Sequence, residues 1–221
     1  MNSSLKCDRF LDRLQVFQPR QDQGTRALAL YSAAIAIADE TTLDRAIEIG
    51  RTMGLKRREF YEIVLQSYLF LGFPRMLQAA DHLDRHFPAP GTDSDFCQFS
   101  AAESESWYSN GLSLCRQIYG DAYEPLKHKV RALAPEVFRW MVIEGYGKVL
   151  SRPGLSIIDR ELAIVACLMM ENYPRQLFSH IRGAINVGTV PALVRTVIED
   201  IGRAAGEGYA TSVSILKRLG M

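Results

Sequence analysis

Apolar residues recur every three or four positions along most of the chain, and the strict alternation that is typical of strands is almost absent. The segment 27–38 is apolar on all sides, which is typical of a helix buried among other helices. The sequence therefore predicts an all-α protein. The expected helices cover residues 24–40, 41–54, 56–71, 73–86, 101–118, 121–133, 135–150, 157–171, 174–188, 189–201 and 208–219.

The segment 155–188 has the clearest helix boundaries. Ser156 and Asp159 have the spacing of a capping box, in which the serine oxygen accepts a backbone amide and the acid lies at the positive end of the helix. Pro174 suits the first turn of the next helix, and Gly188 suits a helix end. We therefore expect two helices joined by a turn at Tyr173.

An internal repeat becomes visible when the two halves of the chain are aligned with a shift of 134 residues. Chance coincidence of apolar positions is the alternative, but two glycines aligned at the same helix-hairpin-helix spacing favour a duplication. The aligned pairs are Leu43 with Leu177, Ile47 with Ile181, Gly54 with Gly188, Ile63 with Val197, Val64 with Ile198 and Gly72 with Gly206.

The segment from Pro88 to Asp95 is dense in proline, glycine, serine, threonine and aspartate, which favour turns over helix. It predicts a linker between the halves. We expect a helical repeat in residues 1–87, a linker in 88–99 and a helical domain in 100–221.

Composition excludes several classes of protein. The chain has 221 residues, of which 48% are hydrophobic and 23% charged, as in ordinary globular proteins. The 26 cationic residues are scattered among 25 acidic ones, which argues against nucleic-acid binding. No apolar run reaches the roughly 18 residues that span a membrane, and charges interrupt the N-terminal segment, which argues against a signal peptide. We expect a cytoplasmic protein.

The four cysteines are far apart, with no Cys-x-x-Cys and no cluster at zinc-ligand spacing. Reduced thiols and no metal site are expected.

Two motifs carry a resemblance to a known family. Pro153-Gly154-Leu155-Ser156-x-x-Asp159-Arg160-Glu161-Leu162, followed by Gln176-Leu177-x-x-His180 and Gly188, resembles the carboxymuconolactone decarboxylase family of the alkylhydroperoxidase D-like superfamily. The likeness covers residues 111–201 and, more weakly, 27–83, where Phe70-Leu71-Gly72-Phe73-Pro74 is similar to the family's Tyr-x-Gly-x-Pro segment.

The resemblance implies an alkylhydroperoxidase D-like helical bundle of two similar halves, a homo-oligomer, a small-molecule substrate and no cofactor. Ala27 and Ala46 stand in the first half where Glu161 and His180 stand in the second. The resemblance therefore implies one active unit per chain, built in the second half.

Glu161 and His180 are the candidate catalytic residues. If the two helices form an antiparallel hairpin, these residues lie about one helical turn apart, roughly 6 Å along the axis. A carboxylate that holds one nitrogen of a histidine fixes its tautomer and raises its basicity, as acid/base catalysis requires. His180 would donate or shuttle a proton, and Gln176, one turn earlier, would contact the substrate. The alternatives are a carboxylate that only complements the helix dipole and a histidine buried in the core.

The missing cysteines decide between two branches of the superfamily. Tyr173 and Gln176 stand where the peroxidase branch has its two cysteines, which disfavours a two-cysteine hydroperoxidase. Cofactor-independent decarboxylation of a small carboxylated lactone, or a related proton transfer, is the expected reaction. Cys167 keeps a peroxidase with a single thiol as an alternative, although its apolar neighbours are more typical of a buried cysteine. A non-catalytic oligomeric binding protein is the third hypothesis.

Tyr146 and Trp140 are further candidates for substrate binding. Aromatic residues at helical spacing more often pack in a core than line a pocket, so both interpretations stay open.

Overall fold

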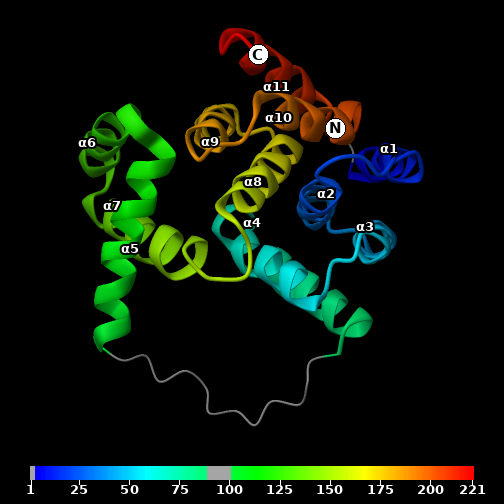
Figure 1. The fold of residues 1–221 in the computed structure, drawn as a ribbon, viewed down its shortest axis with the longest axis horizontal. Helices are drawn as coiled ribbons and strands as arrows, with labels where there is room; N and C mark the ends of the chain where they lie inside the picture. The colour runs from blue at the N-terminus through cyan, green and yellow to red at the C-terminus, as the bar shows by residue number, and fades with distance from the viewer. Residues whose placement is uncertain (1–2, 89–100) are drawn as a thin grey trace. The chain divides into compact units, whose positions relative to one another are not determined.

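The computed structural model describes residues 3–88 and 101–221 (Figure 1). Within these ranges the chain forms helices and no strand, which confirms the all-α prediction. The predicted linker 88–99 lies outside the described residues except for Pro88. In the described part of the chain, no helix combines the length and the apolar character needed to cross a membrane.

The elements follow one another in a simple order, with short 3-10 turns at η1 and η3 and a π-helical segment at η2. They are α1 (Ser3–Gln15), α2 (Gln23–Ile37), α3 (Glu40–Thr52), α4 (Arg57–His86), α5 (Ala101–Tyr119), η1 (Gly120–Ala122), α6 (Tyr123–Leu133), α7 (Pro135–Trp140), η2 (Met141–Leu150), α8 (Ile157–Glu171), α9 (Pro174–Asn186), α10 (Pro191–Ile201), η3 (Gly202–Ala205) and α11 (Glu207–Arg218).

Packing divides the chain into two units that differ from the expected domains. Of the described residues, 3–88 and 154–221 form the first unit, and 101–153 form the second. The expected domain 100–221 is therefore not a single unit, because its C-terminal helices pack with those of the first half. The physical reason is that α2 and α8 are both apolar on all sides and bury each other.

The first unit is organised around α2 and α8. Every residue from Arg26 to Ile37 and from Arg160 to Met170 is buried. The two helices pack against each other, with α3 and α4 against α2 and α9 and α11 against α8 (Figure 1). A helix with no exposed face has to be surrounded in this way, so this pair forms the core of the unit.

The helix boundaries show that the sequence repeat is also a structural repeat. Helices α2, α3 and α4 begin at residues 23, 40 and 57, and α8, α9 and α10 begin at residues 157, 174 and 191, each 134 positions later. Ala38 and Asn172, the equivalent C-caps of α2 and α8, both have left-handed backbone. Gly72 and Gly206 both have positive φ, the first at a kink inside α4 and the second before α11. The duplication thus extends over helices, caps and breaks.

Equivalent side chains meet between the two halves of this unit. Thr25 donates a hydrogen bond of 2.6 Å to Asp159, and these residues occupy the same position in the two repeats. Arg26 pairs with Asp200, and Arg160 hydrogen-bonds Gln66. The two arginines are equivalent in the repeats, and so are their two partners, so each repeat makes the same contact to the other. Such reciprocal contacts indicate an approximate two-fold axis between the halves, like that of a symmetric dimer.

The second unit contains α5, α6, α7 and η2. Its closest packing joins α5 to η2, where two glycines allow the backbones to touch. A Cβ on Gly111 would lie 2.1 Å from the carbonyl oxygen of Val142, and a Cβ on Gly147 would lie 1.9 Å from that of Trp107. Both positions therefore require glycine. The expected helix 135–150 continues through residue 150, but as α-helix only to Trp140 and as π-helix beyond it.

Candidate active site

The α8–α9 hairpin is built as its sequence predicts. Ser156 caps α8, since its hydroxyl oxygen accepts the backbone amide of Asp159 at 3.1 Å. Asn172 adopts left-handed backbone at the end of α8, and Pro174 occupies the first turn of α9. These local signals turn the chain back on itself and bring the two helices into contact.

Glu161 and His180 meet inside this hairpin. His180 Nδ1 lies 3.0 Å from Glu161 Oε2, and the exposed fractions of the two residues are 4% and 0%. With Glu161 ionised, Nδ1 carries the hydrogen and donates it, which places the other ring nitrogen, Nε2, at the reactive end. The predicted spacing of 19 residues therefore does produce a direct carboxylate–imidazole contact.

The second carboxylate oxygen of Glu161 is unusual. Within the described residues Oε1 is buried and has no hydrogen-bond partner. Buried polar atoms are nearly always hydrogen-bonded, and exceptions concentrate where strain, catalysis or a bound polar group explains them. The carboxylate thus has one oxygen fixed on the histidine and one oxygen that a further polar group can satisfy.

The first half of the chain also contributes to this site. The Phe70 ring, on α4, lies edge-on to the His180 imidazole, with ring centroids 5.5 Å apart and planes at 87°. Phe70 belongs to the segment that ends at the Gly72 kink, and Arg75 beyond the kink lies 3.7 Å from Glu171 of α8. The expectation of a site built in the second half alone is therefore incomplete, because Phe70 packs on the imidazole from the other repeat.

The equivalent position in the first half has no polar pair. Ala27 and Ala46 occupy the places of Glu161 and His180, and their exposed fractions are 0% and 1%. Helices α2 and α3 of the first half therefore pack together with a buried alanine at each of these positions. Packing of this kind does not require a carboxylate and an imidazole.

The other predicted site residues lie in different surroundings. Gln176 is exposed on α9, one turn before His180. Tyr146 is buried in the second unit, where its hydroxyl lies 2.7 Å from that of Tyr119. Trp140, also in the second unit, is 63% exposed. The structure thus brings together Glu161 and His180, and it places the two aromatic candidates in the other unit.

Cys167 has the properties of a core residue. Its thiol donates to the carbonyl of Ile164 at 3.3 Å, and the residue is only 2% exposed. Burial raises the pKa of the Cys167 thiol to about 12. The reactive thiolate is therefore a very small fraction near neutral pH.

Arg160 is a buried polar residue that the sequence interpretation missed. It is fully buried, and its guanidinium lies 2.9 Å from the Glu62 carboxylate and 3.3 Å from the Gln66 amide oxygen, both on α4. An arginine within an apolar helix, aligned with Arg26 by the 134-residue shift, was the available signal. This contact ties α8 to α4 one residue away from Glu161.

Metal ligands are not clustered in the described residues. No group of three or more His, Cys, Asp and Glu side chains there could hold a metal ion.

No protein-family model matches the chain. The chain is similar to Peroxisomal protein 2 of Schizosaccharomyces pombe, with 23% identity over 159 residues that cover 70% of this chain and 74% of the relative. An identity this low indicates a distant relative and does not establish a shared activity.

Proposed function

We propose that this protein is a cofactor-independent acid/base enzyme of the carboxymuconolactone decarboxylase type, with His180 as proton donor and Glu161 as its positioning residue. The observation that carries the proposal is the buried 3.0 Å contact between His180 Nδ1 and Glu161 Oε2. A carboxylate on Nδ1 fixes the tautomer and stabilises the imidazolium, which prepares Nε2 to give and take a proton.

The contrast with the first half supports a chemical role for this pair. Burying a carboxylate without full hydrogen bonding costs free energy, and Ala27 and Ala46 fill the equivalent positions without that cost. A pair that is unfavourable for packing and absent from the sister repeat is more easily explained by catalysis than by stability.

The proposed reaction requires only a proton from the protein. In a carboxylated unsaturated lactone the bond between the ring carbon and the carboxylate breaks, carbon dioxide leaves, and the electron pair moves into the conjugated carbonyl. The imidazolium of His180 then protonates the resulting carbanion and takes a new proton from solvent. The Glu161 carboxylate holds the His180 imidazole in place and balances the positive charge of the imidazolium through both steps.

A thiol peroxidase is the weaker alternative. It would depend on Cys167, whose thiol is buried and has a pKa raised to about 12 by that burial. Tyr173 and Gln176 stand at the positions where the peroxidase branch has cysteines. Neither observation favours thiolate chemistry.

A non-catalytic binding protein is the second candidate. It is favoured by the burial of His180, which is only 4% exposed and so offers little surface to a substrate. The two hypotheses differ in whether the imidazole exchanges a proton with a bound molecule.

The deciding experiment measures carbon dioxide release from a carboxylated unsaturated lactone. The wild type should turn the substrate over, and His180→Gln should lower kcat by about 100-fold or more, because glutamine can still donate to Glu161 but cannot shuttle a proton. His128→Gln removes an exposed histidine from α6 and should leave the rate unchanged. Undiminished turnover in His180→Gln would contradict the assignment, and a wild type that binds the lactone without turnover would favour the binding protein.

Assembly and location stay proposals of the same kind. We propose a homo-oligomer, which sedimentation of the purified protein would test. The relative's name associates that protein with the peroxisome, whereas the sequence predicts a cytoplasmic location for this chain. Imaging of a tagged protein beside a peroxisomal marker would decide between them.

A further inference from the structure

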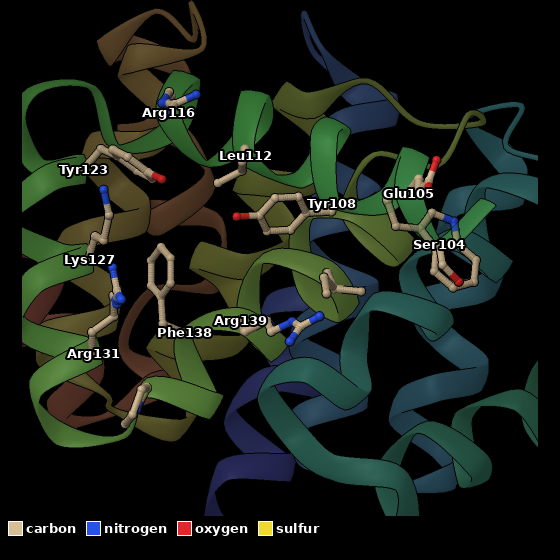
Figure 2. Close-up of a pocket in the computed structure, with 13 residues that line it drawn as sticks. Ser104, Glu105, Tyr108, Leu112, Arg116, Tyr123, Lys127, Arg131, Phe138 and Arg139 are labelled. Carbon is tan, nitrogen blue, oxygen red and sulfur yellow. The ribbon is translucent and has the colours of Figure 1, made fainter. Parts of the chain in front are cut away.

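The second unit contains a hollow that the Glu161–His180 site does not explain (Figure 2). Its volume is about 1040 Å³, at the upper end of the range for small-molecule sites. All the residues that line it lie between Ser104 and Ile143, so the second unit forms it alone.

The lining is strongly cationic. Arg116 comes from α5, Lys127 and Arg131 come from α6, and Arg139 comes from α7, whereas Glu105 is the single carboxylate in the lining. Four positive groups from three helices around one hollow create a potential that attracts anions. The hollow therefore favours a negatively charged ligand.

Among the described residues, Arg131 and Arg139 have no partner, whereas Lys127 and Arg116 each have at least one. Lys127 lies 3.0 Å from the Glu124 carboxylate, and Arg116 lies over the Tyr123 ring. For Arg131 and Arg139, no hydrogen bond, ion pair or ring contact is found among the described residues, and both side chains are exposed. Their guanidinium groups are therefore available to an oxyanion, which they can bind with two parallel hydrogen bonds.

Apolar and aromatic groups form the rest of the lining. Phe138 and Tyr123 are 8% and 4% exposed, and Tyr108 and Leu112 of α5 also line the hollow. In Figure 2 the Tyr108 ring lies near the centre of the view and the Phe138 ring lies to its left. Arg116 is seen above these rings, Lys127 and Arg131 to the left, and Arg139 below Tyr108. Flat rings of this kind pack well against a flat apolar ligand.

We propose that this hollow binds a small organic oxyanion that carries a flat apolar ring, with Arg131 and Arg139 contacting the anion and Phe138 and Tyr108 contacting the ring. The charge of the lining favours the anion, and its aromatic surface favours the ring. A carboxylate and a phosphate monoester offer the same oxyanion chemistry. The proposal does not depend on the reaction assigned to His180.

The test is calorimetric titration of the whole chain with three matched ligands: 2-naphthoate, 2-naphthyl phosphate and the neutral 2-naphthalenemethanol. At least one of the anions should bind tenfold or more tightly than the alcohol, and its affinity should fall as salt is added. Whichever of the two anions binds more tightly shows whether the hollow prefers a carboxylate or a phosphate.

Variants then locate the binding. The double variant Arg131→Gln/Arg139→Gln should weaken the preferred anion at least fivefold and leave the alcohol unchanged. Lys129→Gln is the matched control, because Lys129 is an exposed cation on the same helix α6 and does not line the hollow. Equal affinity for the anions and the alcohol, an equal loss in Lys129→Gln, or no binding of any of the three would overturn the proposal.

Discussion

The two halves of the first unit have the same helices at the same spacing but different polar groups between them. The second half places Glu161 and His180 between α8 and α9, and the first half places Ala27 and Ala46 between α2 and α3. In the first half, Asp44 of α3 contacts His82 and His86 near the C-terminal end of α4. The equivalent positions of the second half are Phe178, Leu216 and Gly220.

This difference separates what the helices need from what the site needs. Two buried alanines are enough to join one helix pair, so the fold does not depend on a polar contact there. The Phe70–His180 contact also has no second copy, because the residues equivalent to these two are Ala204 and Ala46. The symmetric scaffold therefore carries an asymmetric candidate site, to which the first repeat contributes Phe70 and the second contributes Glu161 and His180.

The largest difference between the halves should appear when the equivalent arginines are removed. Arg160→Met leaves the Glu62 side chain, 3% exposed, without its guanidinium, and we expect a loss of about 3 kcal/mol or more in the free energy of unfolding. Arg26→Met leaves Asp200, whose side chain is 14% exposed and can be hydrated, so a loss of about 1 to 2 kcal/mol is expected. Urea denaturation of the two variants measures both values.

A double variant controls this comparison. Arg160→Met/Glu62→Leu removes both charges and should recover most of the stability that Arg160→Met loses, because no carboxylate is then left buried without its cation. Equal losses for Arg160→Met and Arg26→Met would mean that the two contacts are energetically alike and that burial does not distinguish the halves.

The second prediction concerns variants that replace the polar pair of the second half with the alanines of the first half. His180→Ala should lose about 2 to 3 kcal/mol of stability, because the Glu161 carboxylate stays fully buried without the imidazole. Glu161→Ala/His180→Ala reproduces the alanines of the first half and should be more stable than the sum of the single losses predicts, by about 1 to 2 kcal/mol. Thermal and urea unfolding of the four proteins gives the coupling free energy.

Gln176→Ala is the control for this cycle, since it removes an exposed side chain one turn from His180. It should change the stability by no more than about 0.5 kcal/mol. Additive losses in the cycle would show that Glu161 and His180 do not interact in solution.

The sequence predicted the hairpin and its polar pair because their signals are local. Ser156, Asp159, Pro174 and Gly188 mark helix ends by their own chemistry, and helix geometry then brings Glu161 and His180, which the family resemblance singles out, to within about one helical turn of each other. The repeat was visible for the same reason, because the same caps and glycines recur at one fixed shift.

The contacts between the halves were not predictable in this way. Phe70 meets His180, and Arg160 meets Glu62, across 110 and 98 positions of chain. No local pattern encodes which helix packs on which, and the choice depends on the mutual burial of α2 and α8. The same tertiary choice placed residues 154–221 with residues 3–88, which the expected domain boundaries did not anticipate.

The smallest expected effect concerns the contact of Asp44 with His82 and His86, which has no equivalent in the second half. Burial raises the pKa of the Asp44 carboxyl, but hydrogen bonds from His86 and His82 lower it by more than burial raises it. The pKa of this carboxyl therefore lies below its ordinary value. A carboxyl with a lowered folded pKa adds stability above the ordinary aspartate pKa of about 3.9 and loses it as the pH falls through the folded pKa. Asp44→Asn should therefore destabilise the protein at pH 7 and match the wild type more closely at pH 3.

The size of this effect is limited by solvent. The Asp44 side chain is 46% exposed, and the neighbouring Glu40 and Arg85 also carry charge, so we expect less than about 1 kcal/mol at pH 7. Glu48→Gln removes an exposed carboxylate from the same helix and should show a smaller difference between the two pH values. If Asp44→Asn is as stable as the wild type at pH 7, the two histidines do not stabilise this carboxylate in solution. The absence of an equivalent carboxylate at Phe178 would then cost the second half no stability.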